Sequence, residues 1–234
     1  MRNTKKLRIL AIETSGSTFS IALSENGVLI SEVFKNVGLK HSEKLVPTLK
    51  KLLEKKKWKI DSIDKIAVTR GPGSFTGIRV GLSCAKTISQ SMNIPLVAVN
   101  TLDLLRFSAP KGNYTVFPVI DALRNEVYIK KDDDTVIVGI DALLDDLSLK
   151  TGRSEKSDKK ICFVGNAVFS YKERISEALG EKAVFVSEVQ NYPRADILSK
   201  MTFEMKGQSY NKAEPLYIRR SWAEEKPGLR PKPR

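Results

Sequence analysis

The sequence predicts an α/β fold in which a β-β-β-α-β-α unit occurs twice. The first observation is the order of apolar segments: three strand-like runs, a helical stripe, a strand and a helix fill residues 7–92 and recur in reduced form in residues 115–179. The second is a spacing. Glu13 and Asp121 each end the first strand of a half, and each lies eight residues before an isoleucine of the next strand.

This duplication points to an RNase H-like, actin-type architecture. A single layer of this kind leaves its sheet uncovered, whereas two units can pack side by side with a cleft between them. A doubly wound single sheet is the competing architecture. We expect a first domain at residues 1–108, a reduced second domain at 109–206 and a basic tail at 207–234.

The first half begins with three extended runs, at residues 7–12, 18–24 and 28–34. The last two are joined by Glu25-Asn26-Gly27, and Asn-Gly accepts the positive φ that a two-residue hairpin requires. Residues 41–57 form a helix in which Pro47 is tolerable only near the start, or else kinks the helix. After this we expect a strand at 65–69, a helix at 76–92, a strand at 95–99 and a helix capped by Thr101.

The second half repeats this order. Strands are expected at residues 115–120, 125–131 and 135–139, and a helix follows at 140–147. Residues 150–160 are polar and predict an exposed loop. The remaining elements are a strand at 161–164, a helix at 167–179, a strand at 183–186 and a last helix at 194–206. The Pro-, Lys- and Arg-rich tail after Gly207 predicts little regular structure.

Composition excludes several classes of protein. A hydrophobic fraction of 41% indicates a globular chain, and the longest apolar runs are too short to span a bilayer. The two cysteines lack metal-site spacing, which favours free thiols in a reducing cytoplasm.

The net charge of +13 is concentrated at both termini and in residues 40–59, which contain eight Lys and two Glu. Solvated tails and a solvated helix face are one interpretation of this distribution, and peripheral contact with tRNA is the other.

A glycine-rich segment at residues 71–81 lies between a strand and a helix. Its motif residues are Gly71, Gly73, Gly77, Arg79 and Gly81. No lysine follows Gly77, so this is not a Walker A loop. The segment is either a tight turn whose glycines permit close packing or an anion site at the helix N-terminus. The small residues of the helix would also let another helix approach closely.

Two further segments contain residues that could carry chemistry. Glu13, Thr14, Ser15 and Gly16 occupy the position of a phosphate loop, but Thr14 stands where close backbone approach needs glycine, so we interpret the loop as degraded. His41 is the only histidine, so two histidine ligands for a metal are not available. A hydrolase with His41 as base and Ser42 or Ser74 as nucleophile is less favoured than Ser42 as a helix N-cap.

Five motifs, in order along nearly the whole chain, resemble the TsaB (YeaZ) family. They are Ile9-Leu-Ala-Ile-Glu13-Thr-Ser15, His41-Ser-Glu43, Gly71-Pro-Gly-Ser-Phe-Thr-Gly-Ile-Arg79, Asp121-Ala-Leu-Arg-Asn-Glu-Val-Tyr128 and Pro215-Leu-Tyr-Ile-Arg219. The sequence departs from the family at Glu13, where Asp is usual, and at Leu123.

The resemblance implies an ASKHA fold and a role beside the transferase TsaD. TsaD moves threonylcarbamoyl from an adenylate to the adenosine next to the anticodon, in tRNAs that read codons beginning with A. TsaD has a metal site with two histidines, so the resemblance implies a non-catalytic relative without metal or cofactor. The family pairs with TsaD through the first two helices of its N-terminal domain, and the P-loop ATPase TsaE joins the complex.

Two apolar helix stripes agree with this mode of partner binding. They consist of Leu45, Leu49, Leu52, Leu53, Ile78, Leu82, Ala85 and Ile88. We expect part of this surface to form a helix-bundle interface, to favour homodimers of the isolated chain, and to lose its partner in a folded Leu82→Glu variant.

Two other functions remain open. One is a nucleotide-dependent kinase, phosphatase or ATPase with Glu13 and Asp121 around a metal-bound phosphate, and the other is a tRNA-binding protein that uses its basic termini.

Overall fold

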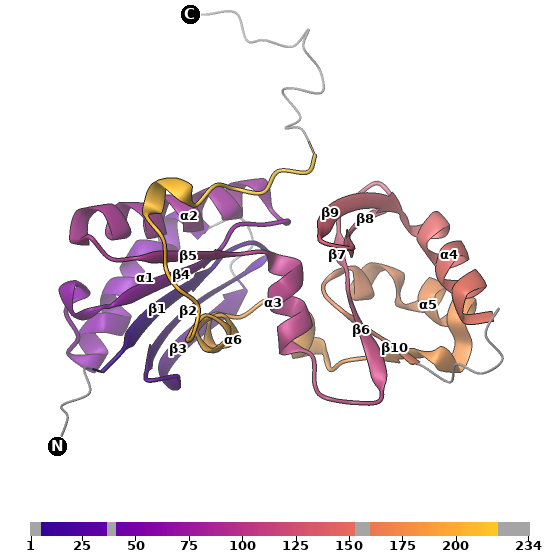
Figure 1. Ribbon diagram of the computed structural model, residues 1–234, viewed down its shortest axis with the longest axis horizontal. Coiled ribbons are helices and arrows are strands. Elements are labelled where there is room, and N and C mark those ends of the chain that lie inside the picture. Colours follow the sequence, from indigo (N-terminus) through magenta and orange to yellow (C-terminus); the bar gives the residue numbers. More distant parts are fainter. Residues whose placement is uncertain (1–5, 37–40, 153–159, 220–234) are drawn as a thin grey trace, which may run out of the picture.

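The computed structural model describes residues 6–36, 41–152 and 160–219, and these form two lobes on either side of helix α3 (Figure 1). The first lobe contains a five-stranded sheet with the order β3-β2-β1-β4-β5. Its strands are β1 (Arg8–Glu13), β2 (Thr18–Glu25), β3 (Val28–Asn36), β4 (Lys65–Thr69) and β5 (Leu96–Val99). Strands β1 to β3 are antiparallel neighbours, whereas β4 and β5 run parallel to β1.

Helices cover both faces of this sheet. They are α1 (His41–Lys56), α2 (Phe75–Met92), α3 (Thr101–Ser108) and α6 (Ala195–Met201), with a 3-10 turn η1 (Ile60–Ser62). Alternate side chains of a strand point to opposite faces, so Leu10 and Ile12 pack in the core that α1 and α2 close, while Ile9 and Ala11 pack with α3 and α6. A central strand covered on both sides reads as one continuous apolar run, as β1 does.

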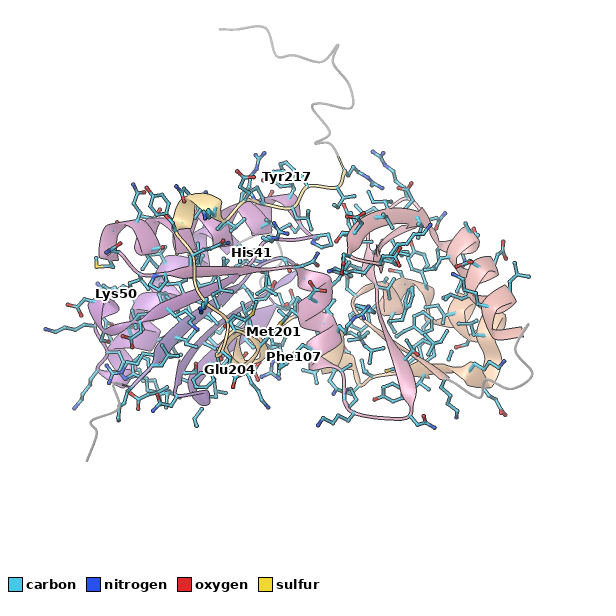
Figure 2. The ribbon with its side chains drawn as sticks, viewed as in Figure 1. His41, Lys50, Phe107, Met201, Glu204 and Tyr217 are labelled. Atoms are coloured by element: carbon cyan, nitrogen blue, oxygen red, sulfur yellow. The ribbon has the colours of Figure 1, made fainter. Side chains whose placement is uncertain are left out.

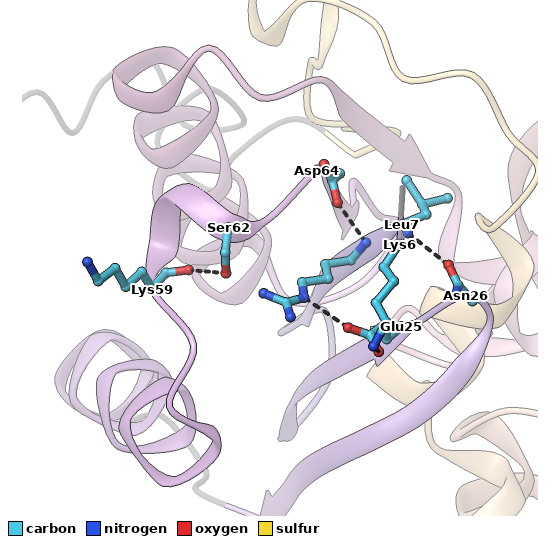
Figure 3. A network of polar contacts seen from close by, with 8 residues as sticks. Lys6, Leu7, Glu25, Asn26, Lys59, Ser62 and Asp64 are labelled. Atoms are coloured by element: carbon cyan, nitrogen blue, oxygen red, sulfur yellow. Dashed lines mark hydrogen bonds and ion pairs between the residues drawn. The ribbon is translucent and has the colours of Figure 1, made fainter. Parts of the chain in front are cut away.

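The hairpin between β2 and β3 forms as predicted. Asn26 and Gly27 have φ angles of 52° and 77°. The Asn26 side chain accepts a hydrogen bond from the Leu7 backbone N–H at 2.8 Å, and Glu25 accepts from Arg8 Nε at 3.0 Å (Figure 3). These contacts tie the start of β1 to the turn.

The second lobe repeats the topology with a divided sheet. Its strands are β6 (Tyr114–Pro118), β7 (Ile120–Asp121), β8 (Glu126–Lys131), β9 (Asp134–Gly139), β10 (Lys160–Val164) and β11 (Ala183–Phe185). Its helices are α4 (Ile140–Gly152) and α5 (Ala167–Leu179). Two 3-10 turns, η2 (Gly180–Lys182) and η3 (Glu188–Asn191), complete it. One part has the order β11-β10-β6 and the other β7-β8-β9. The predicted strand 115–120 is therefore two strands with Val119 between them, although the Val119 N–H still donates to the Val164 carbonyl at 2.8 Å.

Helix α6 lies on the first lobe, whereas the sequence assigns it to the domain at 109–206. Ala195 and Leu198 pack with Ile9 and Ala11 in one apolar cluster, and the Ala195 N–H donates to Ser20 Oγ at 3.0 Å. The tail beyond it is also placed on this lobe: Gln208 bridges to β5, and the turn η4 (Tyr210–Lys212) follows near α2 (Figure 1). A segment late in the chain thus completes the first lobe.

Several predicted details differ at the ends of elements. Asn100 caps α3 by accepting from the Leu102 N–H at 2.8 Å, so Thr101 is the first helical residue and not the cap. Ser42 lies inside the first turn of α1, which continues past Pro47 to Lys56. Helix α4 extends into the predicted loop, to Gly152, and α6 is shorter than predicted.

Some predictions fall outside the described residues. These are residues 1–5 of the basic N-terminal stretch, most of the loop 150–160 and nearly all of the tail 219–234. Within the described ranges, no helix has the length and apolar character that a membrane crossing requires.

Candidate functional site

The turn between β1 and β2 carries the predicted phosphate-loop residues, of which Glu13, Thr14 and Ser15 are buried, whereas Gly16 is half-buried and lines the cleft between the lobes. Glu13 Oε1 accepts hydrogen bonds from the Ser15 N–H at 2.8 Å, from Thr69 Oγ1 at 3.0 Å and from the Ser15 hydroxyl. Glu13 Oε2 is buried without a partner among the described residues. Burial raises the Glu13 pKa to about 7 against the opposing effect of the Ser15 hydrogen bonds. Glu13 therefore stabilises the turn from inside the lobe.

The glycine-rich segment packs directly on this turn. A Cβ atom at Gly77 would lie 2.0 Å from the Thr14 carbonyl oxygen, and one at Gly81 would lie 2.2 Å from Thr14 Oγ1. Thr14 Oγ1 donates to the Gly77 carbonyl at 2.7 Å. Gly77 and Gly81 thus allow α2 to approach the β1–β2 turn closely, whereas Ser83 lines the groove between α2 and α1. Gly71 and Gly73 have positive φ angles in the loop that precedes the helix.

The N-terminus of α2 is occupied by the protein's own oxygens. Ser74 Oγ accepts from the Gly77 N–H at 3.2 Å, and the Ser74 N–H donates to the Ser15 carbonyl at 2.7 Å. An anion would have to displace these partners, because helix N-termini attract phosphate through free N–H groups. The geometry therefore favours the packing interpretation of the glycines over the phosphate-binding one.

A small cleft of about 120 Å³ lies between the two lobes, and a second hollow of about 540 Å³, within the size range of small-molecule sites, adjoins it. Asp121 lines both hollows, with its carboxylate held by the Leu123 N–H at 2.7 Å and by Ser170 Oγ at 3.1 Å. Glu13 lines neither of them. The alternative enzyme needs both carboxylates around one phosphate, and the structure does not bring them together. Glu13 and Asp121 therefore do not fit a metal-bound phosphate held between them.

The hydrolase hypothesis also lacks its geometry. His41 is buried, and its Nε2 lies 3.2 Å from the Thr18 carbonyl oxygen. Ser74 is engaged at the start of α2. Within the described ranges, no three His, Cys, Asp or Glu side chains gather as metal ligands. Both cysteines are free thiols, as the sequence predicted.

An apolar groove, here called the helical groove, lies between α1 and α2. Its volume is about 610 Å³. The exposed or half-buried residues that line it are Ser42, Val46, Lys50, Ile60, Val80, Ser83, Cys84, Thr87 and Ile88. Leu45, Leu49 and Leu53 form its buried floor. Val46 is 59% exposed although its side chain is wholly apolar.

The predicted interface residues are mostly core residues. Leu45, Leu49, Leu52, Leu53, Ile78, Leu82 and Ala85 are buried beneath the two helices, and Ile88 is half-buried. Leu82 is only 3% exposed, so a glutamate there would test folding and not partner binding. The interface residues expected from the sequence therefore lie mostly on the inner faces of α1 and α2. Val46 and Val80, which line the helical groove, lie one position beyond Leu45 and two beyond Ile78 and were not among them.

The motif residue Arg79, in α2, contacts residues 215–219, which are here called the strap. Tyr217, which lies above α2 in Figure 2, stacks on Phe75 with ring centroids 4.2 Å apart. Arg79 Nε donates to the Tyr217 hydroxyl at 2.8 Å. Arg219 then donates to the Ala122 carbonyl at 2.7 Å and pairs with Glu126 in the second lobe. The strap therefore connects α2 to the second lobe.

Comparison with known proteins identifies a family for most of the chain. The family model described as TsaD, tRNA N6-adenosine threonylcarbamoyltransferase, matches residues 35–224. The tRNA threonylcarbamoyladenosine biosynthesis protein TsaB of Bacillus subtilis (strain 168) is 29% identical over 226 residues, which cover 94% of this chain and 97% of that protein. A tRNA N6-adenosine threonylcarbamoyltransferase of Kosmotoga olearia is 38% identical over 111 residues, which cover 41% of this chain and 34% of that protein.

A solved structure supports the fold. YeaZ from Pseudomonas aeruginosa superposes with a TM-score of 0.67 at 24% identity, covering 90% of this chain and 99% of that structure. The predicted actin-like fold of two RNase H-like units is confirmed, and so is the resemblance to TsaB (YeaZ) that the motifs carry.

Proposed function

The chain belongs to the TsaD family of tRNA N6-adenosine threonylcarbamoyltransferases and their relatives, and on that premise we propose that it is a non-catalytic subunit that activates a TsaD-type transferase. The reaction it supports would be the formation of threonylcarbamoyladenosine next to the anticodon. The observation that carries this proposal is the helical groove, because it is a large apolar surface on the outside of the lobe.

The chemistry of the groove supports a protein partner. Its floor is leucine, and its walls carry Val46, Val80, Cys84 and Ile88 with small hydroxyl side chains between them. Exposed apolar surface of this kind is typical of sites that contact another protein. Lys50, the one charged residue of the lining, pairs with Glu54 and points outward at the rim (Figure 2).

Family membership supports a related chain as that partner. A transferase of the family shares sequence with this chain, so the two would present corresponding helices to one another. Such a pair resembles an isologous dimer, in which the same patch on both chains is self-complementary. The same argument applies to two copies of this chain, so self-association would compete with the transferase for the helical groove.

The interior of the chain supports a role without catalysis. Glu13 is locked inside the first lobe, the α2 N-terminus is filled by Ser15 and Ser74, and the single histidine contacts a backbone carbonyl. Glu13, the α2 N-terminus and His41 are thus part of the packing, whereas Asp121 lines the cleft between the lobes. The P-loop ATPase TsaE remains an expectation of the family resemblance, and no described residue is assigned to it. A cytoplasmic location belongs to the same proposal.

The role of the helical groove in partner binding can be tested by placing a glutamate at either of two positions in it. We expect Val46→Glu and Val80→Glu to weaken binding of a TsaD-type transferase by at least about tenfold, since each leaves a charge unpaired in an apolar contact. The matched control is Val28→Glu, because Val28 is 64% exposed and does not line the helical groove. Affinity is measured by calorimetry and folding by thermal unfolding.

Reconstituted tRNA modification tests the function itself. With transferase and the other components present, omission of this chain should abolish or strongly reduce product, and Val46→Glu should reduce it in proportion to the weaker binding. Full activity without the chain would refute the proposal. Folded Val46→Glu and Val80→Glu variants that bind the transferase as well as Val28→Glu would place the interface elsewhere.

A further inference from the structure

A second groove lies on the other flank of α1, against the edge strand β3. Its volume is about 440 Å³. Four exposed lysines line it: Lys35 from β3 and Lys44, Lys51 and Lys55 from α1. We call it the lysine groove. None of the four lysines forms an ion pair with another residue in the described ranges.

The acidic residues of the groove do not cancel this charge. Glu32 is committed to Arg194, with which it forms an ion pair, and it also accepts from Ser20 Oγ at 2.8 Å. Glu43 is the other acid of the lining and stands in the first turn of α1, where the helix dipole favours it. One available carboxylate therefore faces four ammonium groups that have no ion-pair partner among the described residues.

Helical spacing separates this charge from the helical groove. Lys44, Lys51 and Lys55 are seven and four residues apart, so they share one face and extend over about 16 Å at 1.5 Å per residue. Val46 and Lys50 line the opposite flank, toward α2. Helix α1 thus presents an apolar flank and a basic flank that are distinct surfaces.

We propose that the lysine groove binds the phosphate backbone of the RNA substrate. The proposal rests on the proposed function, in which tRNA is modified by the partner bound to the adjacent flank of α1. Lysine ammonium groups act as point charges that suit phosphate oxygens. Bases are recognised in RNA mainly by stacking on aromatic or arginine side chains, and the lining of this groove contains neither. The contact would therefore position tRNA without reading its sequence.

The test compares a variant that lacks three lysine charges in the lysine groove with a variant that lacks three lysine charges outside it. The groove variant is Lys44→Gln/Lys51→Gln/Lys55→Gln. The control is Lys111→Gln/Lys131→Gln/Lys200→Gln, which changes net charge equally at exposed positions outside the groove. The probe is an unmodified transcript of a tRNA that reads codons beginning with A. Its affinity for the full chain, alone and with the transferase, is measured by fluorescence anisotropy between about 50 and 200 mM salt.

We expect the groove variant to bind tRNA about tenfold or more weakly. Its slope of log K against log salt should be shallower by about 2–3, since each phosphate that the protein no longer neutralises lowers the slope by roughly one unit. The control should keep the wild-type slope. Both variants should bind the transferase normally, because the helical groove is untouched.

Three results would overturn the proposal. An unchanged salt slope in a groove variant that still binds the transferase refutes the RNA contact and leaves the proposed function intact. Equal losses of affinity in groove variant and control would reduce the effect to net charge. Loss of transferase binding with tRNA affinity retained would identify the groove as a contact for an acidic protein surface. Failure of the unmutated chain to bind the transferase refutes the proposed function separately.

Discussion

The carboxyl group of Glu13, in the turn interpreted as a degraded phosphate loop, is part of the core of the first lobe. Three donors converge on Oε1, while Oε2 is buried without a partner among the described residues. The neutral acid is favoured because burial penalises the charged form more than the hydrogen bonds stabilise it. An ordinary phosphate-loop acid needs the charged form facing a ligand, so the burial itself argues against that use.

This burial predicts a pH-dependent stability. The Glu13 pKa rises from 4.5 to about 7 on folding, so folding takes up a proton between these values. The favourable contribution is complete below pH 4.5 and is lost as pH rises through about 7. We expect Glu13→Gln, which resembles the neutral acid, to match wild type near pH 4 and to exceed its free energy of unfolding by about 3 kcal/mol at pH 8. Urea unfolding across this range measures the difference.

Glu25 supplies a control of opposite sign. Hydrogen bonds from Lys6 and Arg8 lower its pKa, so its contribution is present at neutral pH and lost in acid (Figure 3). Glu25→Gln should therefore lose stability at neutral pH relative to acid, whereas Glu13→Gln should gain it. Parallel pH profiles for Glu13→Gln and wild type would contradict the neutral buried acid.

At the scale of elements, α2 can pack closely on the β1–β2 turn because glycines at the contact have no side chain. A Cβ at Gly77 would overlap the Thr14 carbonyl, which belongs to a buried backbone segment that cannot move aside easily. We expect Gly77→Ala to cost about 2–4 kcal/mol of unfolding free energy, although alanine is the better helix former. Gly139→Ala is the control, because a Cβ there meets nothing within 4 Å and should change stability little. Denaturant unfolding of both variants shows whether Gly77 is required for close packing on Thr14 or only for backbone flexibility.

The same scale shows what the sequence could and could not predict. The hairpin at Asn26-Gly27 was predictable because it depends on local backbone preference. The apolar stripes of α1 and α2 were also visible, but a stripe identifies the apolar side of a helix and not what covers it. Leu82 therefore looked available for a partner although its own sheet buries it.

Long-range contacts account for the other differences. Helix α6 joins the first sheet through Ala195 and Leu198, which no local pattern near residue 195 reveals. The carboxyl groups of Glu13 and Asp121 likewise accept hydrogen bonds from Thr69 and Ser170, which are distant from them in sequence. The motif at residues 215–219 was recognised, but its contact with both lobes required the fold.

At the scale of the whole molecule, polar contacts among the described residues connect the two lobes, which lie on either side of α3. Lys130 pairs with Asp103 at 3.0 Å, Asn100 Nδ2 donates to Thr135 Oγ1 at 2.9 Å, and Arg219 reaches the turn that follows β7. The Arg219 contact differs from the others because it comes from the strap at the far end of the described chain. The Leu216 N–H anchors that strap by donating to the Arg70 carbonyl at 2.7 Å. The strap thereby couples the position of α2, on which the helical groove depends, to the second lobe.

Removing the guanidinium of Arg219 should loosen the lobes without unfolding either one. Arg219 and Glu126 are both partly exposed, so Arg219→Ala should cost about 1 kcal/mol or less of unfolding free energy. Hydrogen exchange at the Ala122 and Glu126 amides, which bond to the Glu126 and Leu123 carbonyls, should nevertheless rise, and small-angle scattering should show a larger radius of gyration. Arg219→Lys should fall between, since lysine keeps the charge but lacks the fork that serves two acceptors. If Arg219→Ala scatters and exchanges as wild type does, the other contacts between the lobes, including the apolar packing of Leu102 and Leu105 on Ile120 and Val164, hold them without Arg219.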